Sequence, residues 1–277
     1  MQRRLSLSSS PIRPPALPGR GLSQRFRMSR TVAALILREM STRYGRSPGG
    51  YVWAVIEPLG SIFLMSLGFS LLVRSPPIGN SFILFFATGF VPFVFYQTIS
   101  NAIARAFRFS GALLSYPVVT WVDAIVARLL LNSLTQILVS YLIMGVILFM
   151  QSDPITLDFR PIVEAMALSL FFGLAIGTLN CALMGLIQVW DQVWSIISRP
   201  LFLASGVIFL YESLPAIAQN ILWYNPLMHI LGIMRMGFYP GYDADYVSVP
   251  YVIGVSLVLL FLGVMLLGRY HRQILAS

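Results

Sequence analysis

The residues that could do chemistry in this sequence are few and widely spaced. The histidines are His229 and His271, and the single cysteine, Cys181, lies in an apolar run, so no His-Glu-x-x-His or Cys-x-x-Cys motif is present. Asp243 and Asp245 have the spacing of a metal-binding pair that glycosyltransferases use for sugar nucleotides. We interpret the pair as part of a solvated loop, because it is short and the predicted topology places it on the outer side of the membrane, where sugar nucleotides are not expected.

The basic residues narrow the chemistry further. All 19 are Arg, against 10 acids, which gives a net charge of +9. A P-loop needs a Lys on the phosphates and a Schiff-base enzyme needs a Lys amine, so neither activity is expected. The sequence therefore predicts no catalytic residue, no metal site and no cofactor in this chain.

Composition identifies the fold class. Of the 277 residues, 57% are hydrophobic and 10% charged, whereas a soluble domain has about 25% charged residues. A helix needs ~20 apolar residues to cross a ~30 Å hydrocarbon layer. We therefore predict an all-α polytopic membrane protein with six transmembrane helices, at about residues 51–73, 81–104, 121–150, 161–187, 194–211 and 250–268, of which the fifth is short.

An amphipathic interface helix is predicted over residues 29–44, before the first span. Its apolar residues follow the spacing of one helix face. Glu39 and Arg43 are four apart in the order that favours an ion pair. Residues 1–28, rich in Arg, Pro and Ser, are predicted to be a disordered basic cytoplasmic tail, and residues 29–277 one membrane domain. The apolar face consists of Ala33, Ile36, Leu37, Met40 and Tyr44.

The distribution of Arg gives the orientation. Six spans put both termini on one side, and that side then holds fourteen Arg: ten within residues 3–46, two within 105–108 and two within 269–272. The opposite loops hold three. The positive-inside rule thus predicts that both termini are cytoplasmic.

Polar and aromatic residues inside the spans are candidates for lining a path through the membrane. Charged side chains within a membrane are costly unless they meet water or a partner. The charged side chains near the cytoplasmic ends of the spans form either a vestibule for an anionic polymer or local ion pairs, such as Asp123 with Arg128 or Arg199. The aromatic rings fit either an interface belt or a strip along which sugars slide. The candidate polymer path is Glu57, Tyr96, Arg128, Asn132, Gln136 and Arg199.

The 38-residue loop at 212–249 is long for a compact protein. Its two apolar patches, 214–224 and 227–238, are each too short to span, so we predict a re-entrant helical segment between helices five and six. The candidate outer gate in it is Trp223, Tyr224, Asn225, Pro226, His229 and Arg235.

Several of these segments resemble a known family. The first motif consists of Leu37, Arg38, Glu39, Arg43, Tyr44, Ser47, Gly50, Trp53, Pro58 and Leu59. With residues 194–215, 224–227 and 235–242, it resembles the capsular polysaccharide export permeases, which are transmembrane subunits of type-2 ABC exporters. The resemblance spans most of residues 30–270. This chain departs from the family at Gly232, where relatives often have an acid before the arginine that matches Arg235.

The resemblance implies a homodimer in the bacterial inner membrane, bound to two copies of a cytoplasmic ABC ATPase that holds ATP and Mg. The cargo would be a lipid-linked polysaccharide moved from cytoplasm to periplasm, with a possible periplasmic adaptor and outer-membrane export protein and no nucleic acid. Two alternatives are an O-antigen or teichoic acid exporter permease and a membrane-embedded glycosyltransferase. The residues expected to couple to the ATPase are Arg38, Glu39, Arg43, Tyr44, Ser115, Tyr116 and Pro117.

Overall fold

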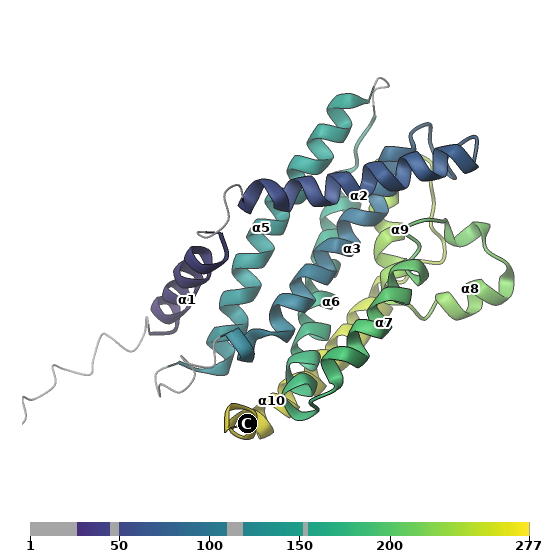
Figure 1. Ribbon diagram of the computed structural model, residues 1–277. Coiled ribbons are helices and arrows are strands. Elements are labelled where there is room, and N and C mark those ends of the chain that lie inside the picture. The colour runs from purple at the N-terminus through teal and green to yellow at the C-terminus, as the bar shows by residue number, and fades with distance from the viewer. Residues whose placement is uncertain (1–26, 45–49, 110–118, 152–154, 277) are drawn as a thin grey trace, which may run out of the picture.

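Helices make up the fold, which the computed structural model describes for residues 27–44, 50–109, 119–151 and 155–276 (Figure 1). Within those ranges there is no β-strand, in agreement with the predicted all-α class. The predicted tail before residue 27 and the predicted coupling residues Ser115, Tyr116 and Pro117 lie outside them. The helices are α1 (Arg27–Tyr44), α2 (Gly50–Leu72), α3 (Phe82–Ala104), α5 (Trp121–Met150), α6 (Phe159–Leu186), α7 (Trp190–Ala204), η1 (Tyr211–Ser213), α8 (Ala216–Leu222), α9 (Pro226–Phe238) and α10 (Val249–Ala276).

Five helices, α2, α3, α5, α6 and α10, are long and apolar enough to cross a membrane. They match the predicted spans closely, except that α10 continues past residue 268 to Ala276. The predicted fifth span, 194–211, differs, because α7 has 15 residues and ends at Ala204. At 1.5 Å per residue α7 is about 22 Å long, short of a ~30 Å hydrocarbon layer. The sixth span thus stays a prediction.

Helix α7 ends where it does because of a glycine. Gly206 has φ +81°, a left-handed conformation that a side chain at Cβ disfavours and that commonly ends a helix. The backbone then turns through residues 205–210 before η1. The apolar run of the sequence continues across this turn, which is why composition alone extended the helix.

A capping box starts α5. The Thr120 hydroxyl accepts a hydrogen bond from the Asp123 N–H at 3.2 Å, and the Asp123 carboxylate accepts from the Thr120 N–H at 2.9 Å. Within the described chain Asp123 is thus a cap and forms no ion pair with Arg128 or Arg199, which was one interpretation of the sequence.

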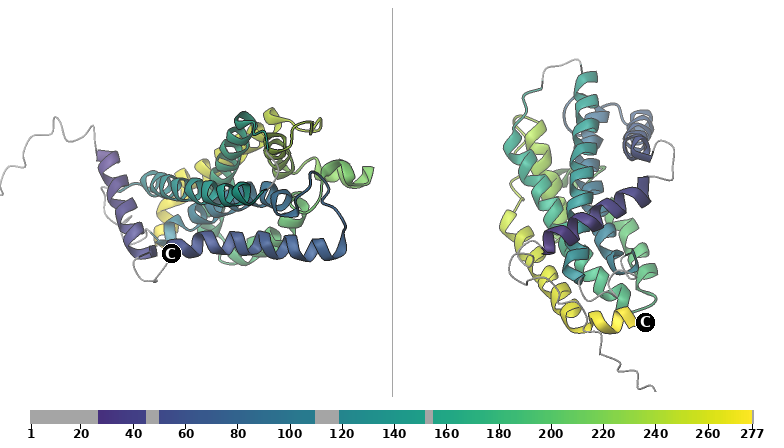
Figure 2. Two further views of the ribbon diagram at one scale, coloured as in Figure 1. Left: turned by 90° about the horizontal axis from the view of Figure 1, so that it is seen from above. Right: turned by 90° about the vertical axis from the view of Figure 1, so that its left-hand side faces the viewer.

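Helix α3 is the centre of the bundle. It packs against α2, α5, α6 and α9. In its apolar 18-residue stretch 67% of the residues are buried, compared with 11% in that of α2 at the edge of the bundle. Figures 1 and 2 show that the end of α3 and the starts of α5 and α7 lie at the same end of the bundle as the C-terminus, with α1 nearby. The predicted topology makes this the cytoplasmic end.

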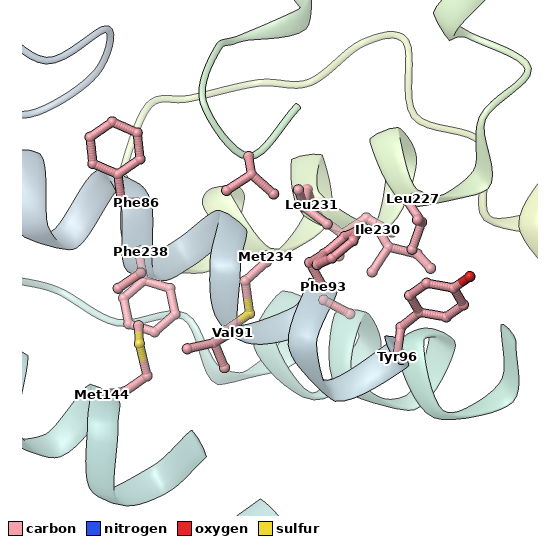
Figure 3. Close-up of a cluster of buried hydrophobic side chains, with 14 of the residues drawn as sticks. Phe86, Val91, Phe93, Tyr96, Met144, Leu227, Ile230, Leu231, Met234 and Phe238 are labelled. Carbon is pink, nitrogen blue, oxygen red and sulfur yellow. The ribbon is translucent and has the colours of Figure 1, made fainter. Parts of the chain in front are cut away.

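The core lies where α9 fits between α3, α6 and α10. Nearly every residue of α9 is buried, although α9 is only 13 residues long. Figure 3 shows Leu227 and Ile230 of α9 close to Phe93 and Tyr96 of α3, and Met234 of α9 close to Val91. The second apolar patch of the long loop is therefore part of the packed interior.

Two glycines let α6 approach α3 closely. An added Cβ at Gly177 would lie 2.9 Å from the Ser100 carbonyl oxygen, and one at Gly173 would lie 3.0 Å from that of Tyr96. Small residues at this spacing are a common means of packing helices in membranes.

We expect Gly177→Ala to destabilise the protein by about 1–3 kcal/mol, because the new methyl group would push against the α3 backbone. Thermal unfolding of the detergent-solubilised protein measures the loss. Gly145→Ala in α5 is the matched control, since nothing lies within 4 Å of its added Cβ. Equal unfolding temperatures for the two variants would contradict the close α3–α6 contact.

Candidate functional site

Helix α1 presents two faces. Val32 and Leu35 are buried against Ala127 of α5, and Glu39 follows one turn later on that face. Leu37 and Met40, from the apolar face predicted by spacing, are exposed. One face thus holds α1 on the bundle and another remains available to a membrane or a partner, and the role as an amphipathic interface helix stays a prediction.

A buried ion pair joins α1 to α5. The Glu39 carboxylate lies 3.4 Å from the Arg128 guanidinium, and the two side chains are 5% and 9% exposed. Breaking such a pair on one side leaves a charge in a low-dielectric environment, so the pair strongly favours this placement of α1. Of the other predicted coupling residues on α1, Arg38 is exposed, and the side chains of Arg43 and Tyr44 lie outside the described part.

The same arginine reaches α3. Arg128 donates a hydrogen bond to the carbonyl oxygen of Ala102 and lies over the Phe109 ring, 4.4 Å from its centre. Arg38 approaches the same ring at 5.9 Å. Arg128 therefore connects α1, α5 and the end of α3 in one contact.

A cavity of about 320 Å³ opens between α3 and α7 at this end of the bundle. The Asp191 carboxylate, at the start of α7, pairs with Arg108 at 3.0 Å and with Arg105 at 3.8 Å. A narrow extension reaches the hydroxyl of Ser100, which is buried and has no hydrogen-bond partner within the described residues. The cavity is lined by Phe93, Gln97, Asn101, Arg105, Met184, Asp191, Trp194, Ser195, Ser198, Arg199 and Phe202.

This lining has the chemistry of a carbohydrate site. Amides and hydroxyls exchange hydrogen bonds with sugar hydroxyls, and aromatic rings offer flat apolar faces. Guanidinium groups pair with carboxylates or phosphates. The lining can therefore hydrogen-bond to hydroxyl groups and pair with anions.

The predicted polymer-path residues do not form one surface. Arg199 lines the α3–α7 cavity, and Tyr96, which is buried and stacked on Phe172, lines its narrow extension. Arg128 is engaged with α1. The remaining three lie elsewhere: Glu57 is exposed, Gln136 half-buried and Asn132 buried, with its amide donating to the Arg128 carbonyl.

The sequence analysis missed the polar stripe on α3. Gln97, Asn101 and Arg105 are spaced four apart, so they share one helix face, and Ser195 and Ser198 face them from α7. That spacing was the available signal. It was overlooked because neutral residues in an aromatic-rich span do not stand out singly as charges do.

His229 of α9 connects the end of α8 to the start of α10. His229 donates from Nε2 to the Trp223 carbonyl at 2.7 Å and accepts at Nδ1 from the Ser248 N–H at 3.2 Å. These partners define a neutral imidazole protonated on Nε2. Burial raises the pKa of nearby Tyr246 to about 12, so its hydroxyl stays protonated and donates to the Met228 carbonyl at 3.3 Å.

Other predicted gate residues have structural partners. Asn225 caps α9 by accepting from the Leu227 N–H at 3.1 Å, with Pro226 at the first helical position, and its amide donates to the Ala204 carbonyl at 2.9 Å. Tyr224 is exposed, and its carbonyl accepts from the Tyr251 hydroxyl at 2.7 Å. A gating function for these residues stays a prediction.

Arg235 is fully buried and clamps the turn after α7. Its guanidinium donates to the carbonyls of Gly206 at 2.7 Å, Val207 at 3.2 Å and Phe209 at 3.0 Å. It also lies over the Phe85 ring at 4.5 Å. The charge is therefore stabilised by carbonyl dipoles and a ring.

Gly232 is also explained by its surroundings. An added Cβ would collide with the Tyr246 hydroxyl. The packing around α9 thus leaves no room for an acid at this position.

These features define an all-helical membrane protein with a polar cavity between its helices. A model of the family described as ABC-2 type transporter matches residues 30–239, and the chain belongs to this family.

Similar proteins carry names from capsule export. The polysialic acid transport protein KpsM of Escherichia coli is 30% identical over 248 residues, 89% of this chain and 96% of KpsM. The capsule polysaccharide export inner-membrane protein BexB of Haemophilus influenzae is 26% identical over 245 residues, 88% of this chain and 92% of BexB. The capsule polysaccharide export inner-membrane protein CtrC of Neisseria meningitidis serogroup A is also 26% identical over 245 residues, 88% of this chain and 92% of CtrC.

We expect Glu39 and Arg128 to be energetically coupled. In a double-mutant cycle, Glu39→Gln and Arg128→Gln should each lower the free energy of unfolding, and the double variant should lose less than their sum by about 1–3 kcal/mol. Denaturant unfolding in detergent provides the four values. Losses that add to within ~0.5 kcal/mol would contradict a direct contact.

Arg235→Met should destabilise the turn after α7, because three carbonyls lose a charged donor in a buried site. We expect a loss of about 2–4 kcal/mol and faster proteolysis near residue 206. The matched control is Arg160→Met, which removes an exposed arginine at the start of α6. If both variants behaved alike, the clamp would have no energetic role.

Proposed function

We propose that this chain is the membrane permease subunit of an ATP-driven exporter that moves a lipid-linked, acidic capsular polysaccharide from the cytoplasm to the periplasm. The observation that carries the proposal is the cavity between α3 and α7, which combines aromatic rings, amides, hydroxyls and arginines. The relatives named for capsule polysaccharide or polysialic acid transport support the same cargo.

A homodimer would complete the conduit. None of the residues of α7 is buried, and most of α2 is exposed, so both helices present apolar surface outside the bundle. A second copy covering α7 would turn the open α3–α7 cavity into an enclosed path. Two copies of a cytoplasmic ABC ATPase would act on α1, whose contact through Arg128 reaches the cavity wall at α3.

The topology we propose has both termini in the cytoplasm and a sixth crossing at α7. Helix α7 would start at the cytoplasmic end, and residues 205–215 would complete the crossing. α8 and the buried α9 would then form the re-entrant segment on the periplasmic side. The distribution of Arg across the loops supports this orientation.

Export of a capsular polymer is distinguished from the alternatives by where the polymer accumulates. Cells lacking this chain should make the polysaccharide and retain it inside, whereas loss of a glycosyltransferase would abolish synthesis. Asp243→Asn with Asp245→Asn should leave synthesis intact. Chemical analysis of the retained polymer separates capsule from O-antigen or teichoic acid. Normal surface polymer in the deletion strain would overturn the proposal.

The cavity itself is tested by Arg199→Gln and Trp194→Ala. We expect either variant to lower surface polymer severalfold at unchanged protein level, because each removes a contact for an acidic sugar unit. Arg160→Gln is the control, since it removes an exposed arginine outside the cavity. Export at the wild-type rate in both cavity variants would contradict a path between α3 and α7.

The need for a separate ATPase is tested by measuring ATP hydrolysis by the purified chain with and without a partner. The purified chain should hydrolyse no ATP, and hydrolysis should depend on an added P-loop polypeptide encoded beside it. A periplasmic adaptor and an outer-membrane export protein are further partners that the proposal includes. ATP hydrolysis by the purified chain alone would contradict the proposal that a separate subunit hydrolyses ATP.

A further inference from the structure

A second cavity, of about 620 Å³, lies between α1, α5 and the end of α3, and shares Asn101 and Arg105 with the first. It is lined by Thr98 and Asn101 of α3, by Arg105 and Arg108, which follow the end of α3, and by Arg128 of α5. The first three recur every three or four residues, so they line one face of the helix. The cavity therefore carries a row of polar side chains on its α3 side, opposite α1 and α5.

The charges around this cavity favour an anion. Three arginines line it, and Glu39 is its single acidic lining residue among those described. Glu39 pairs with Arg128 on one side, and Asp191 pairs with Arg105 and Arg108 from the other cavity. The pairs with Asp191 are largely exposed, at 59% and 66% for the arginines, so they are weak and readily exchanged for a stronger anion.

Neutral donors complete the site. The Thr98 hydroxyl and the Asn101 amide both line the cavity. A phosphate group accepts hydrogen bonds from hydroxyls and amides as well as from guanidinium forks. The lining thus offers a phosphate ester both charge and directional donors.

We infer that this cavity binds the phosphate group of an anionic membrane lipid, held chiefly by Arg105 and Arg108. The position favours a lipid over a soluble phosphate, because the apolar helix α3 ends at Ala104, directly before Arg105, and Glu39 of α1 lines the same cavity. Basic pockets between helices at the cytoplasmic face are typical headgroup sites. A lipid bound here would fill the groove between α1 and α3 and hold them together.

Native mass spectrometry of the full chain in detergent tests the site, with phosphatidylglycerol and phosphatidylcholine offered in equal amounts. The wild type should retain phosphatidylglycerol preferentially. Arg105→Gln with Arg108→Gln should lower that retention on the order of tenfold. The matched control, Arg269→Gln with Arg272→Gln, removes two exposed arginines from the end of α10 and should change it less than twofold.

For Asp191→Asn we expect the opposite change, a higher retention of phosphatidylglycerol. This test does not depend on whether the arginine variants are stable. Removing this carboxylate releases Arg105 and Arg108, so retention of phosphatidylglycerol should rise severalfold. Unchanged or lower retention, or an equal fall in the α10 control, would overturn the site. The readout involves no transport, so its failure is independent of the proposed export function.

Soluble glycerol phosphate separates the two sources of phosphate. If the lipid is the ligand, millimolar glycerol phosphate should leave the bound phosphatidylglycerol in place. Displacement by glycerol phosphate at that concentration would overturn the assignment to a lipid.

Discussion

Arginine keeps its charge at any pH a protein experiences, so a membrane protein must surround each buried guanidinium with acceptors. Arg128 obtains a carboxylate from α1 and a carbonyl from α3, and Arg235 obtains three carbonyls from the turn after α7. Each set of acceptors comes from a segment distant in sequence. The need to satisfy these two charges thus fixes α1 and the end of α7 on the bundle, and with them the shape of both cavities.

Length and apolar composition predicted five of the helices because crossing a hydrocarbon layer is a local requirement of each segment. The end of α7 was not predicted, since it depends on a backbone conformation at Gly206 that lies within a continuous apolar run. The burial of α9 was missed for a related reason. Its apolar patch is too short to span, and only its neighbours show that it belongs to the core.

The candidate site was predicted in part. Arg199 stood out because a charge in an apolar run is conspicuous, and it lines the α3–α7 cavity. Arg128 stood out for the same reason, but its partner Glu39 lies 89 positions away, and no local pattern identifies that contact. Gln97 and Asn101 are neutral, so only their helical spacing with an arginine could have indicated a shared polar face.

The two cavities share one turn at the end of α3, so a movement of that turn would change both cavities. Asn101 and Arg105 line both, and Ala102 between them accepts the hydrogen bond from Arg128. The start of α3 is close-packed against α9. At its end, one face packs in a second cluster with α5 and α6, and the other face borders both cavities. A movement of α1 is therefore expected to reach, through Glu39 and Arg128, the one turn of α3 that lines both cavities.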